Sequence, residues 1–140
     1  MAYWLMKSEP ETWSWNDQVK AGAKGTSWDG VRNHQAKANL MKMKKGDRAF
    51  FYHSGDEKSV VGIMEIVGEH KPDPSDKTGT FVVVDVKALS PLPEPVTLKS
   101  ARSEKSLAKM VLLNNSRLSV QPVSASEWAT VCKLGGMKSG

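Results

Sequence analysis

The sequence predicts an α+β fold, in which strands and short helices alternate without a regular βαβ repeat. Runs of aromatic or β-branched residues at 48–53 and 81–86 are typical of strands. Residues that favour helix starts, Asn33 and Ser124, each precede apolar residues at helical spacing. The length of 140 residues is that of one domain, so we expect a single domain over 1–140.

The first third of the chain predicts a buried strand, a short helix and a turn. The strand covers 2–7, which is almost wholly apolar. Ser14 with Asp17 three residues later resembles a capping box and predicts a helix that runs through Val19. Asp29-Gly30 then favours a turn, because glycine accepts positive φ and aspartate bonds its own backbone.

The next segment predicts a basic helix followed by an aromatic strand. Asn33 is the expected cap, and Ala36, Leu40 and Met43 recur at the helical period. Gly46-Asp47 ends this helix, and the strand 48–53 follows. Polar residues at the end of that strand are placed to reach a ligand.

Two more strands are expected in the middle of the chain. The first is 60–67, where Gly62 indicates a bulge or the close approach of another backbone. The second is 81–86, after a loop over 70–79. The three prolines of segment 91–95 predict an extended connector.

The last third predicts helical pieces on either side of one strand. Segment 100–113 has the spacing of two short helices or one broken helix. Segment 117–122 alternates and ends in a proline, which favours a strand at a sheet edge. Ser124 and Glu127 form a capping box for a final helix that ends at Gly135.

Composition favours a soluble protein with a polyanionic partner. The net charge is +5 and the pI is near 9.4, which raises the expectation of nucleic-acid binding only modestly. No apolar run suits a membrane span or a signal peptide, so we expect a cytoplasmic protein with no membrane partner. Cys132 is the only cysteine, which excludes an internal disulfide and a cysteine-based zinc site.

Motifs for catalysis, metals or cofactors are missing from the sequence. It contains no phosphate-binding glycine loop, GxSxG, HExxH or dinucleotide fingerprint. The three histidines, His34, His53 and His70, do not have metal-ligand spacing, and Cys132 falls on the apolar stripe of the last helix. We therefore expect no metal, no cofactor and no catalytic residue.

Five tryptophans give the chain its candidate ligand surface. Trp4 and Trp128 are expected in the core, whereas Trp13 and Trp15 fit a helix staple and a pocket rim equally well. Trp28 lies in a turn with little periodic reason to point inward, so ligand stacking is favoured over a core position. Beside it, a basic cluster interleaved with aromatics suits phosphates, although an ordinary solvated helix face explains its lysines equally well.

Several segments closely resemble the signature blocks of the EVE domain, in the order of that family and across nearly the whole chain. These segments are Tyr3–Pro10, Trp28–Asn33, Gly46-Asp47, Phe51–Ser54 and Arg117–Val123. Many EVE domains carry a long insertion after the motif that Pro72-Asp73-Pro74 matches, whereas 75–80 is short here. Contacts made by that insertion are not expected in this chain.

The resemblance implies a PUA-like small mixed β-barrel with flanking short helices, related to the YTH readers of methylated adenine. It also implies non-enzymatic recognition of a modified base of DNA or RNA in an aromatic-lined pocket, with Trp28 stacking on the base. The residues that would line or rim this pocket are Trp28, Lys7, Ser8, Glu9, Asn33, Tyr52, His53, Ser54, Ser119 and Gln121. Phosphates would be held by Arg32, Lys37, Lys44, Lys45 and Arg48.

Two other functions stay open on the sequence. A hydrolase or nuclease acting on modified nucleic acid would use Glu9, Asp29 and His53 as acid and base. A small-molecule sensor would bind a nucleoside-like ligand in the same pocket. We expect a monomer in each case, and the sequence does not choose between DNA and RNA or name the modification.

Overall fold

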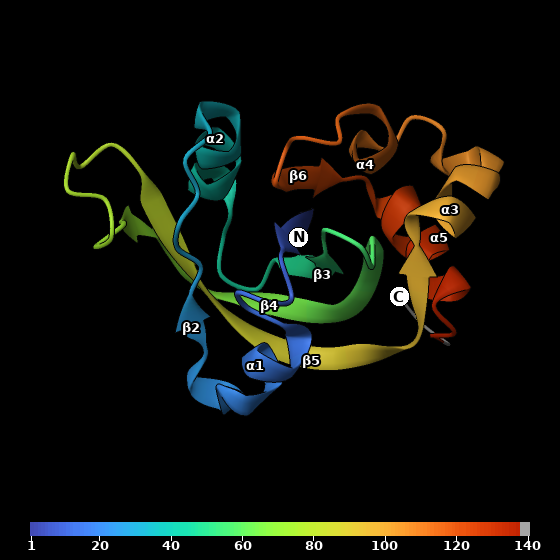
Figure 1. The fold of residues 1–140 in the computed structure, drawn as a ribbon, viewed down its shortest axis with the longest axis horizontal. Coiled ribbons are helices and arrows are strands. Elements are labelled where there is room, and N and C mark those ends of the chain that lie inside the picture. The colour runs from blue at the N-terminus through green and yellow to red at the C-terminus, as the bar shows by residue number, and fades with distance from the viewer. Residues whose placement is uncertain (138–140) are drawn as a thin grey trace.

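Six strands form a curved mixed sheet with helices on both of its faces (Figure 1). The computed structural model describes residues 1–137. Its strands are β1 (Tyr3–Ser8), β2 (Thr26–Ser27), β3 (Arg48–His53), β4 (Ser59–Pro72), β5 (Val82–Thr97) and β6 (Val120–Val123). Its α-helices are α1 (Trp15–Lys20), α2 (His34–Lys42), α3 (Leu98–Ser103), α4 (Val111–Asn114) and α5 (Ala125–Leu134), with short 3-10 turns η1 (Gly22–Lys24) and η2 (Lys105–Leu107).

The strand order is β2-β5-β4-β3-β1-β6, which confirms the predicted α+β class. Within residues 1–137, β2 pairs only with β5 and β6 pairs only with β1. The sheet therefore curves like a barrel but does not close. The edge position expected for the strand that contains Pro122 is confirmed.

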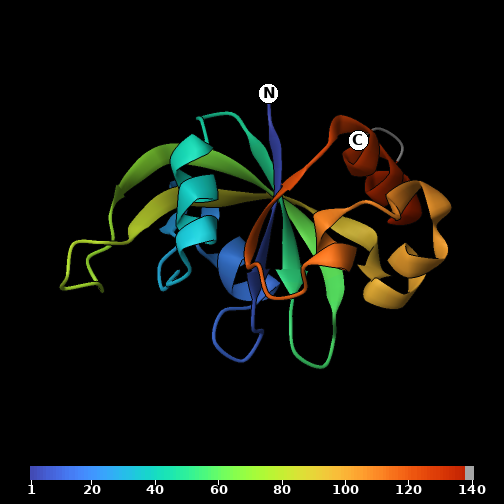
Figure 2. The same ribbon diagram turned by 90° about the horizontal axis from the view of Figure 1, so that it is seen from above.

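The parallel pair of β1 and β3 decides which segments meet at each end of the sheet. Tyr3 faces Arg48 at the start of the pair, and Ser8 faces His53 at its end. Figure 2 accordingly shows the N-terminus and the loop that enters β3 at one end, and the loops that follow β1 and β3 at the other. The loops after the two strands are tied together, because the Ser54 N–H donates to the Ser8 carbonyl at 2.9 Å.

A separate apolar cluster packs on each face of the sheet. One contains Trp15, Trp28 and Phe51, where both indoles meet the Phe51 ring edge-on, with centroids 5.5 and 5.4 Å away. The other contains Phe50 and Trp128, which stack at 3.8 Å. Because neighbouring residues of a strand point to opposite faces, Phe50 and Phe51 serve different clusters.

Local signals set most helix starts as expected. The Ser14 and Ser124 capping boxes are both formed, and the Asn33 side chain accepts from the Ala36 N–H at 2.9 Å. Each cap satisfies a backbone N–H that has no partner within the helix. The prediction of short helical pieces in the C-terminal third is confirmed by α3, η2 and α4.

The hairpin of β4 and β5 is longer than the sequence predicted. β4 continues to Pro72 through residues expected in a loop, and β5 continues to Thr97 through the expected connector. Irregular pairing explains this extension, since the register between the two strands shifts at four places. The bulge expected at Gly62 is one of them, and a Cβ there would lie 2.6 Å from the Trp15 ring.

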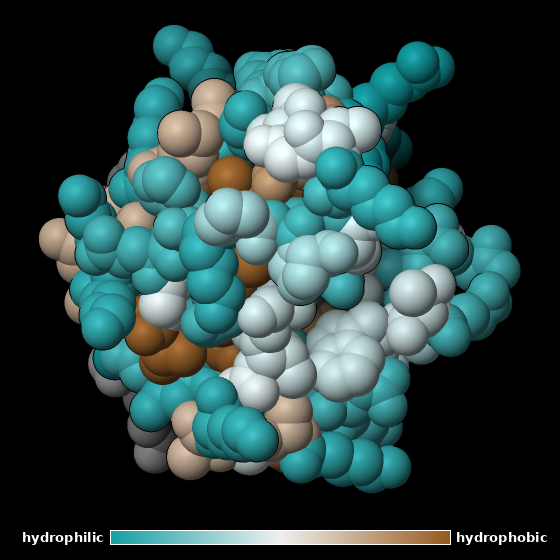
Figure 3. Space-filling model, turned by 90° about the vertical axis from the view of Figure 1, so that its left-hand side faces the viewer, coloured by the Kyte–Doolittle hydropathy of each residue, from teal (hydrophilic) through white to brown (hydrophobic). Residues whose placement is uncertain are grey.

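One face of the molecule is covered largely by hydrophilic side chains. Figure 3 shows the face at the left of Figure 1, where apolar atoms are exposed only in small patches. None of the helices formed by residues 1–137 is long and apolar enough to cross a membrane.

Candidate functional site

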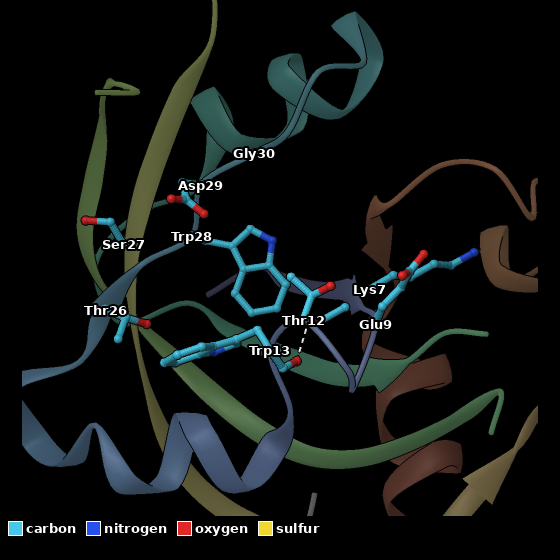
Figure 4. A pocket seen from close by; sticks show the side chains of 10 residues that line it. Lys7, Glu9, Thr12, Trp13, Thr26, Ser27, Trp28, Asp29 and Gly30 are labelled. Atoms are coloured by element: carbon cyan, nitrogen blue, oxygen red, sulfur yellow. Dashed lines mark hydrogen bonds between the residues drawn. The ribbon is translucent and has the colours of Figure 1, made fainter. Parts of the chain in front are cut away.

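A cavity of about 560 Å³ opens where β1 ends and the loop before α2 passes over the sheet (Figure 4). The residues that line it come from two segments of the N-terminal third. They are Lys7, Ser8, Glu9, Thr12, Trp13, Thr26, Ser27, Trp28, Asp29 and Gly30. The close-up shows the indoles of Trp13 and Trp28 at the same cavity.

Trp28 is both a wall of the cavity and part of the core. Only 8% of its surface is exposed, and its ring packs edge-on against Phe51. Its N–H donates to the Val84 carbonyl at 2.8 Å, which fixes the backbone beside the central hairpin. Trp28 therefore packs in the core and still presents part of its surface to the cavity, so core packing does not exclude ligand stacking.

Trp13 is held in place by a buried amide. Its indole Nε1–H donates to Oε1 of Gln18 at 2.9 Å, and Gln18 is fully buried. The Ser8 hydroxyl donates to the Trp13 carbonyl at 2.5 Å, the bond drawn in Figure 4. Both ends of this half-buried residue are thus oriented before any ligand arrives.

The turn that carries Trp28 is tied to the β4–β5 loop by one buried carboxylate. Oδ2 of Asp73 accepts from the Gly30 N–H at 3.1 Å and from Arg32 at 3.0 Å. Its Oδ1 accepts from the N–H and the hydroxyl of Ser75 at 2.7 and 2.6 Å. Burial raises the pKa of Asp73, but these hydrogen bonds outweigh burial and lower the pKa to about 2.

Three of the four hydroxyl groups that line the cavity have their hydrogens engaged elsewhere. The Ser27 hydroxyl donates to Asp85 at 2.7 Å, and the Thr26 hydroxyl donates to Gln18 at 3.2 Å. The Ser8 hydroxyl donates to Trp13, as described above. Each oxygen keeps lone pairs that can accept, so these three groups offer a ligand acceptors rather than donors.

The structure brings together only part of the predicted base-binding set. Trp28, Lys7, Ser8 and Glu9 line the cavity. Tyr52 and Ser54 line a separate groove on the other face of the sheet. Four predicted residues line neither the cavity nor the groove. They are His53, the helix cap Asn33, the half-buried Ser119 and the fully buried Gln121.

His53 has both ring nitrogens engaged. Nε2 accepts the Trp15 N–H at 3.0 Å, so Nδ1 carries the proton and faces Glu57. Glu9 and Asp29 are exposed at the cavity, whereas His53 is 9% exposed and is not among its lining residues. The three residues named for an acid–base site are therefore not gathered in one place.

None of the predicted phosphate-binding residues lines the cavity. Arg32 is engaged with Asp73 and Ser75, and its guanidinium lies 5.5 Å from the Phe81 ring centre. Lys44 and Lys45 line a hollow beside Met1 and Ala2, at the start of β1. Arg48 also lies at that end, opposite Tyr3, and Lys37 belongs to α2.

Six of the lining residues were not predicted as base contacts: Thr12, Trp13, Thr26, Ser27, Asp29 and Gly30. For Trp13 the available signal was its position just before a capped helix, which left a rim and a staple equally favoured. Among residues 1–137, no group of three or more histidine, cysteine or acidic side chains is placed to hold a metal ion.

Comparison with known proteins identifies relatives over nearly the whole chain. The family model described as the EVE domain matches residues 2–134. Human thymocyte nuclear protein 1 is 36% identical over 165 residues, which cover 95% of this chain and 73% of that protein.

Solved structures agree with this match. The NMR structure of a Rhodopseudomonas palustris protein is 56% identical, with a TM-score of 0.94, and covers 100% of this chain and 97% of that one. The crystal structure of human THYN1 protein in complex with 5-methylcytosine containing DNA is 34% identical, with a TM-score of 0.90, and covers 99% of each chain. The YTH domain of Zygosaccharomyces rouxii MRB1, at 18% identity and a TM-score of 0.58, shares the fold, which confirms the PUA-like architecture.

Proposed function

The chain belongs to the EVE domain family, and from that membership and its two-indole cavity we propose that it is a non-enzymatic module that recognises a modified base of a nucleic acid. The human relative solved with 5-methylcytosine containing DNA supports a nucleic-acid ligand. The observation that carries the proposal is the pair Trp13 and Trp28 at one cavity. Aromatic rings and a planar base stack with roughly 1 to 3 kcal/mol per base.

The hydrogen-bonding groups of the cavity favour a base that carries an amino group. The oxygens of Ser8, Thr26 and Ser27 are left as acceptors, and Glu9 and Asp29 add two carboxylates. Cytosine N4 and adenine N6 present an exocyclic amino donor on the major-groove edge, whereas thymine, uracil and guanine present a carbonyl at the same position and the guanine amino group lies on the other edge. We expect a cytosine or adenine derivative, and the 5-methylcytosine of the human complex is consistent with this choice.

Reaching the cavity requires the base to leave its stack. Extrusion costs a few kcal/mol, which is comparable to the stacking energy recovered in the pocket. Edge contacts and contacts to phosphate must therefore supply most of the net affinity. The module should act as a monomer. A cytoplasmic location stays a prediction, since the human relative carries the word nuclear in its name.

A binding screen tests this function. Fluorescence-labelled oligonucleotides that differ only in one base, in DNA and RNA form, are titrated at fixed salt with the wild-type protein and with Trp13→Ala. We expect one methylated cytosine or adenine to bind at least tenfold more tightly than its unmodified partner, and Trp13→Ala to remove most of that difference. Equal affinity for every base, or conversion of the best-bound oligonucleotide to a product of altered mass, would refute the proposal.

A further inference from the structure

A second groove begins where the base cavity ends, and Lys7 lines both. This groove has a volume of about 150 Å³ and lies between the β3–β4 turn and α4. Its lining residues include Ser54, Lys58, Leu98, Leu112 and Ser116.

Alternation along β1 explains why the two hollows meet at its end. Ser8 contacts Trp13 on the cavity face, whereas the Lys7 ammonium lies 5.6 Å from the ring centre of Tyr52 on the opposite face. Figure 4 shows Lys7 extending away from the two indoles, toward the C-terminal half of the chain. A nucleic-acid strand that inserts one base into the cavity can therefore pass over the end of β1 into the groove.

Within the described part of the chain, Lys7 has a partly buried ammonium group without an acidic partner. Its Nζ donates to the Ser116 carbonyl at 2.7 Å, and none of the ion pairs among residues 1–137 includes it. Burial lowers the pKa of Lys7, because the charged form loses hydration that no carboxylate replaces. A phosphate oxygen at this position would supply the missing counter-charge.

The groove continues toward further cations. Lys58 and Leu98 also line the next hollow, together with Lys99 and Arg102. That hollow includes the carboxylates of Asp56 and Glu57, of which Glu57 faces His53.

Lys58 is held in a constrained conformation at this junction. It is the one non-glycine residue among 1–137 with a positive φ, 45°, and its carbonyl accepts the Leu98 N–H at 2.8 Å. Such backbone is sparsely populated for side chains other than glycine, and it occurs preferentially at functional sites.

We propose that the groove from Lys7 past Lys58 to Arg102 holds the sugar–phosphate strand that flanks the recognised base. Lys7 contacts the phosphate next to that base, and Lys58 and Arg102 contact phosphates further along. The inference rests on the proposed function, because it needs a nucleic acid in the base cavity. It also removes Lys44 and Lys45 from the interface, since they lie beyond the start of β1, about 17 Å or more from its other end at 3.3 Å per residue.

The test compares two variants that remove the same charge. Lys58→Ala/Arg102→Ala alters the groove, and Lys44→Ala/Lys45→Ala is the matched control. Affinity for a single-stranded oligonucleotide that carries the preferred base is measured from 0.1 to 1 M salt, and affinity for the free modified nucleoside is measured in parallel.

We expect the groove variant to lower the slope of log affinity against log salt by about 0.7 per lost contact. For two lost contacts, the affinity gained between 1 M and 0.1 M salt should then be about 25-fold smaller than for the wild type. Its nucleoside affinity and the slope of the control should match the wild type. A slope lowered by the control and not by the groove variant would overturn the groove. Oligonucleotide binding without any nucleoside binding or base preference would instead overturn the base cavity, and the slopes would still decide the groove.

Discussion

Asp73→Asn should loosen the turn that carries Trp28 without touching a bound base. In the wild type, each carboxylate oxygen accepts two hydrogen bonds. Oδ2 accepts from Gly30 and Arg32, and Oδ1 accepts from the N–H and the hydroxyl of Ser75. An amide has one acceptor oxygen and one donor nitrogen, so either the Gly30 N–H or the Ser75 N–H loses its partner. The charge opposite Arg32 is lost as well.

The lowered pKa of Asp73 sets the size of the effect. A shift from 3.8 to about 2 corresponds to roughly 2.5 kcal/mol. The Arg32 side chain is 42% exposed, so solvent screens part of this interaction and we expect a loss of roughly 1 to 2 kcal/mol. For a domain of this length, the melting temperature should fall by roughly 3 to 8 °C at pH 7.

The dependence on pH follows from the direction of the shift. Because folding lowers this pKa, the carboxylate stabilises the protein above the unfolded value near 4, and its contribution is lost as the pH falls toward 2. Melting curves of wild type and Asp73→Asn should therefore converge between pH 4 and pH 2. Affinity for the preferred base should fall at pH 7, because Gly30 and Trp28 line the cavity.

Asp76→Asn is the matched control. The pKa of Asp76 is also lowered to about 2, by hydrogen bonds from Thr78, Phe81 and Thr80, but none of these residues lines the base cavity. This variant should lose stability with little change in base affinity. If Asp73→Asn melts like the wild type at pH 7, or keeps full base affinity at temperatures where it is folded, the turn does not depend on this carboxylate.

Three further experiments test other parts of the structure. Trp28→Ala should cost roughly 3 to 5 kcal/mol of stability, because the ring is part of the core. Trp13 is half-buried, so Trp13→Ala should cost less stability and still lower base affinity at least tenfold. Urea unfolding measures the stability and binding titrations the affinity; equal stability losses would contradict the assignment of Trp28 to the core and Trp13 to the rim. Gly62→Ala should destabilise by roughly 1 to 3 kcal/mol, since its Cβ would lie 2.6 Å from the Trp15 ring, and an unchanged melting temperature would refute this contact. Cys132 is buried, which raises the pKa of its thiol to about 11, so a thiol reagent at pH 8 should modify it only on unfolding; rapid labelling of the native protein would show that the site is open.

Helix caps and the first strands were predictable because their causes are local. Ser14, Asn33 and Ser124 each bond a backbone N–H within three residues, so the sequence around them contains the whole interaction. The extended β4–β5 hairpin was not predictable in the same way, because its register shifts at four places and these shifts are set by the pairing between the two strands, not by a pattern within either strand.

Positions in the candidate site followed the same division. Trp28 was placed at the cavity in advance by its turn, and Ser8 and Glu9 by the resemblance to the EVE domain. Lys44 and Lys45 are near Trp28 in sequence but lie at the other end of the sheet, because β3 runs parallel to β1 and the chain must return to its start. Trp13 depended on a bond to the buried Gln18, which no local pattern shows.

The most direct test of the account is an NMR titration of the five indole N–H signals with an oligonucleotide that carries the preferred modified base. Trp13 and Trp28 line the cavity, whereas Trp4, Trp15 and Trp128 are buried and do not line it. We expect the Trp13 and Trp28 signals to shift as the oligonucleotide binds, and the Trp4 and Trp128 signals to stay in place. Saturable binding that leaves the Trp13 and Trp28 signals unmoved would contradict this expectation.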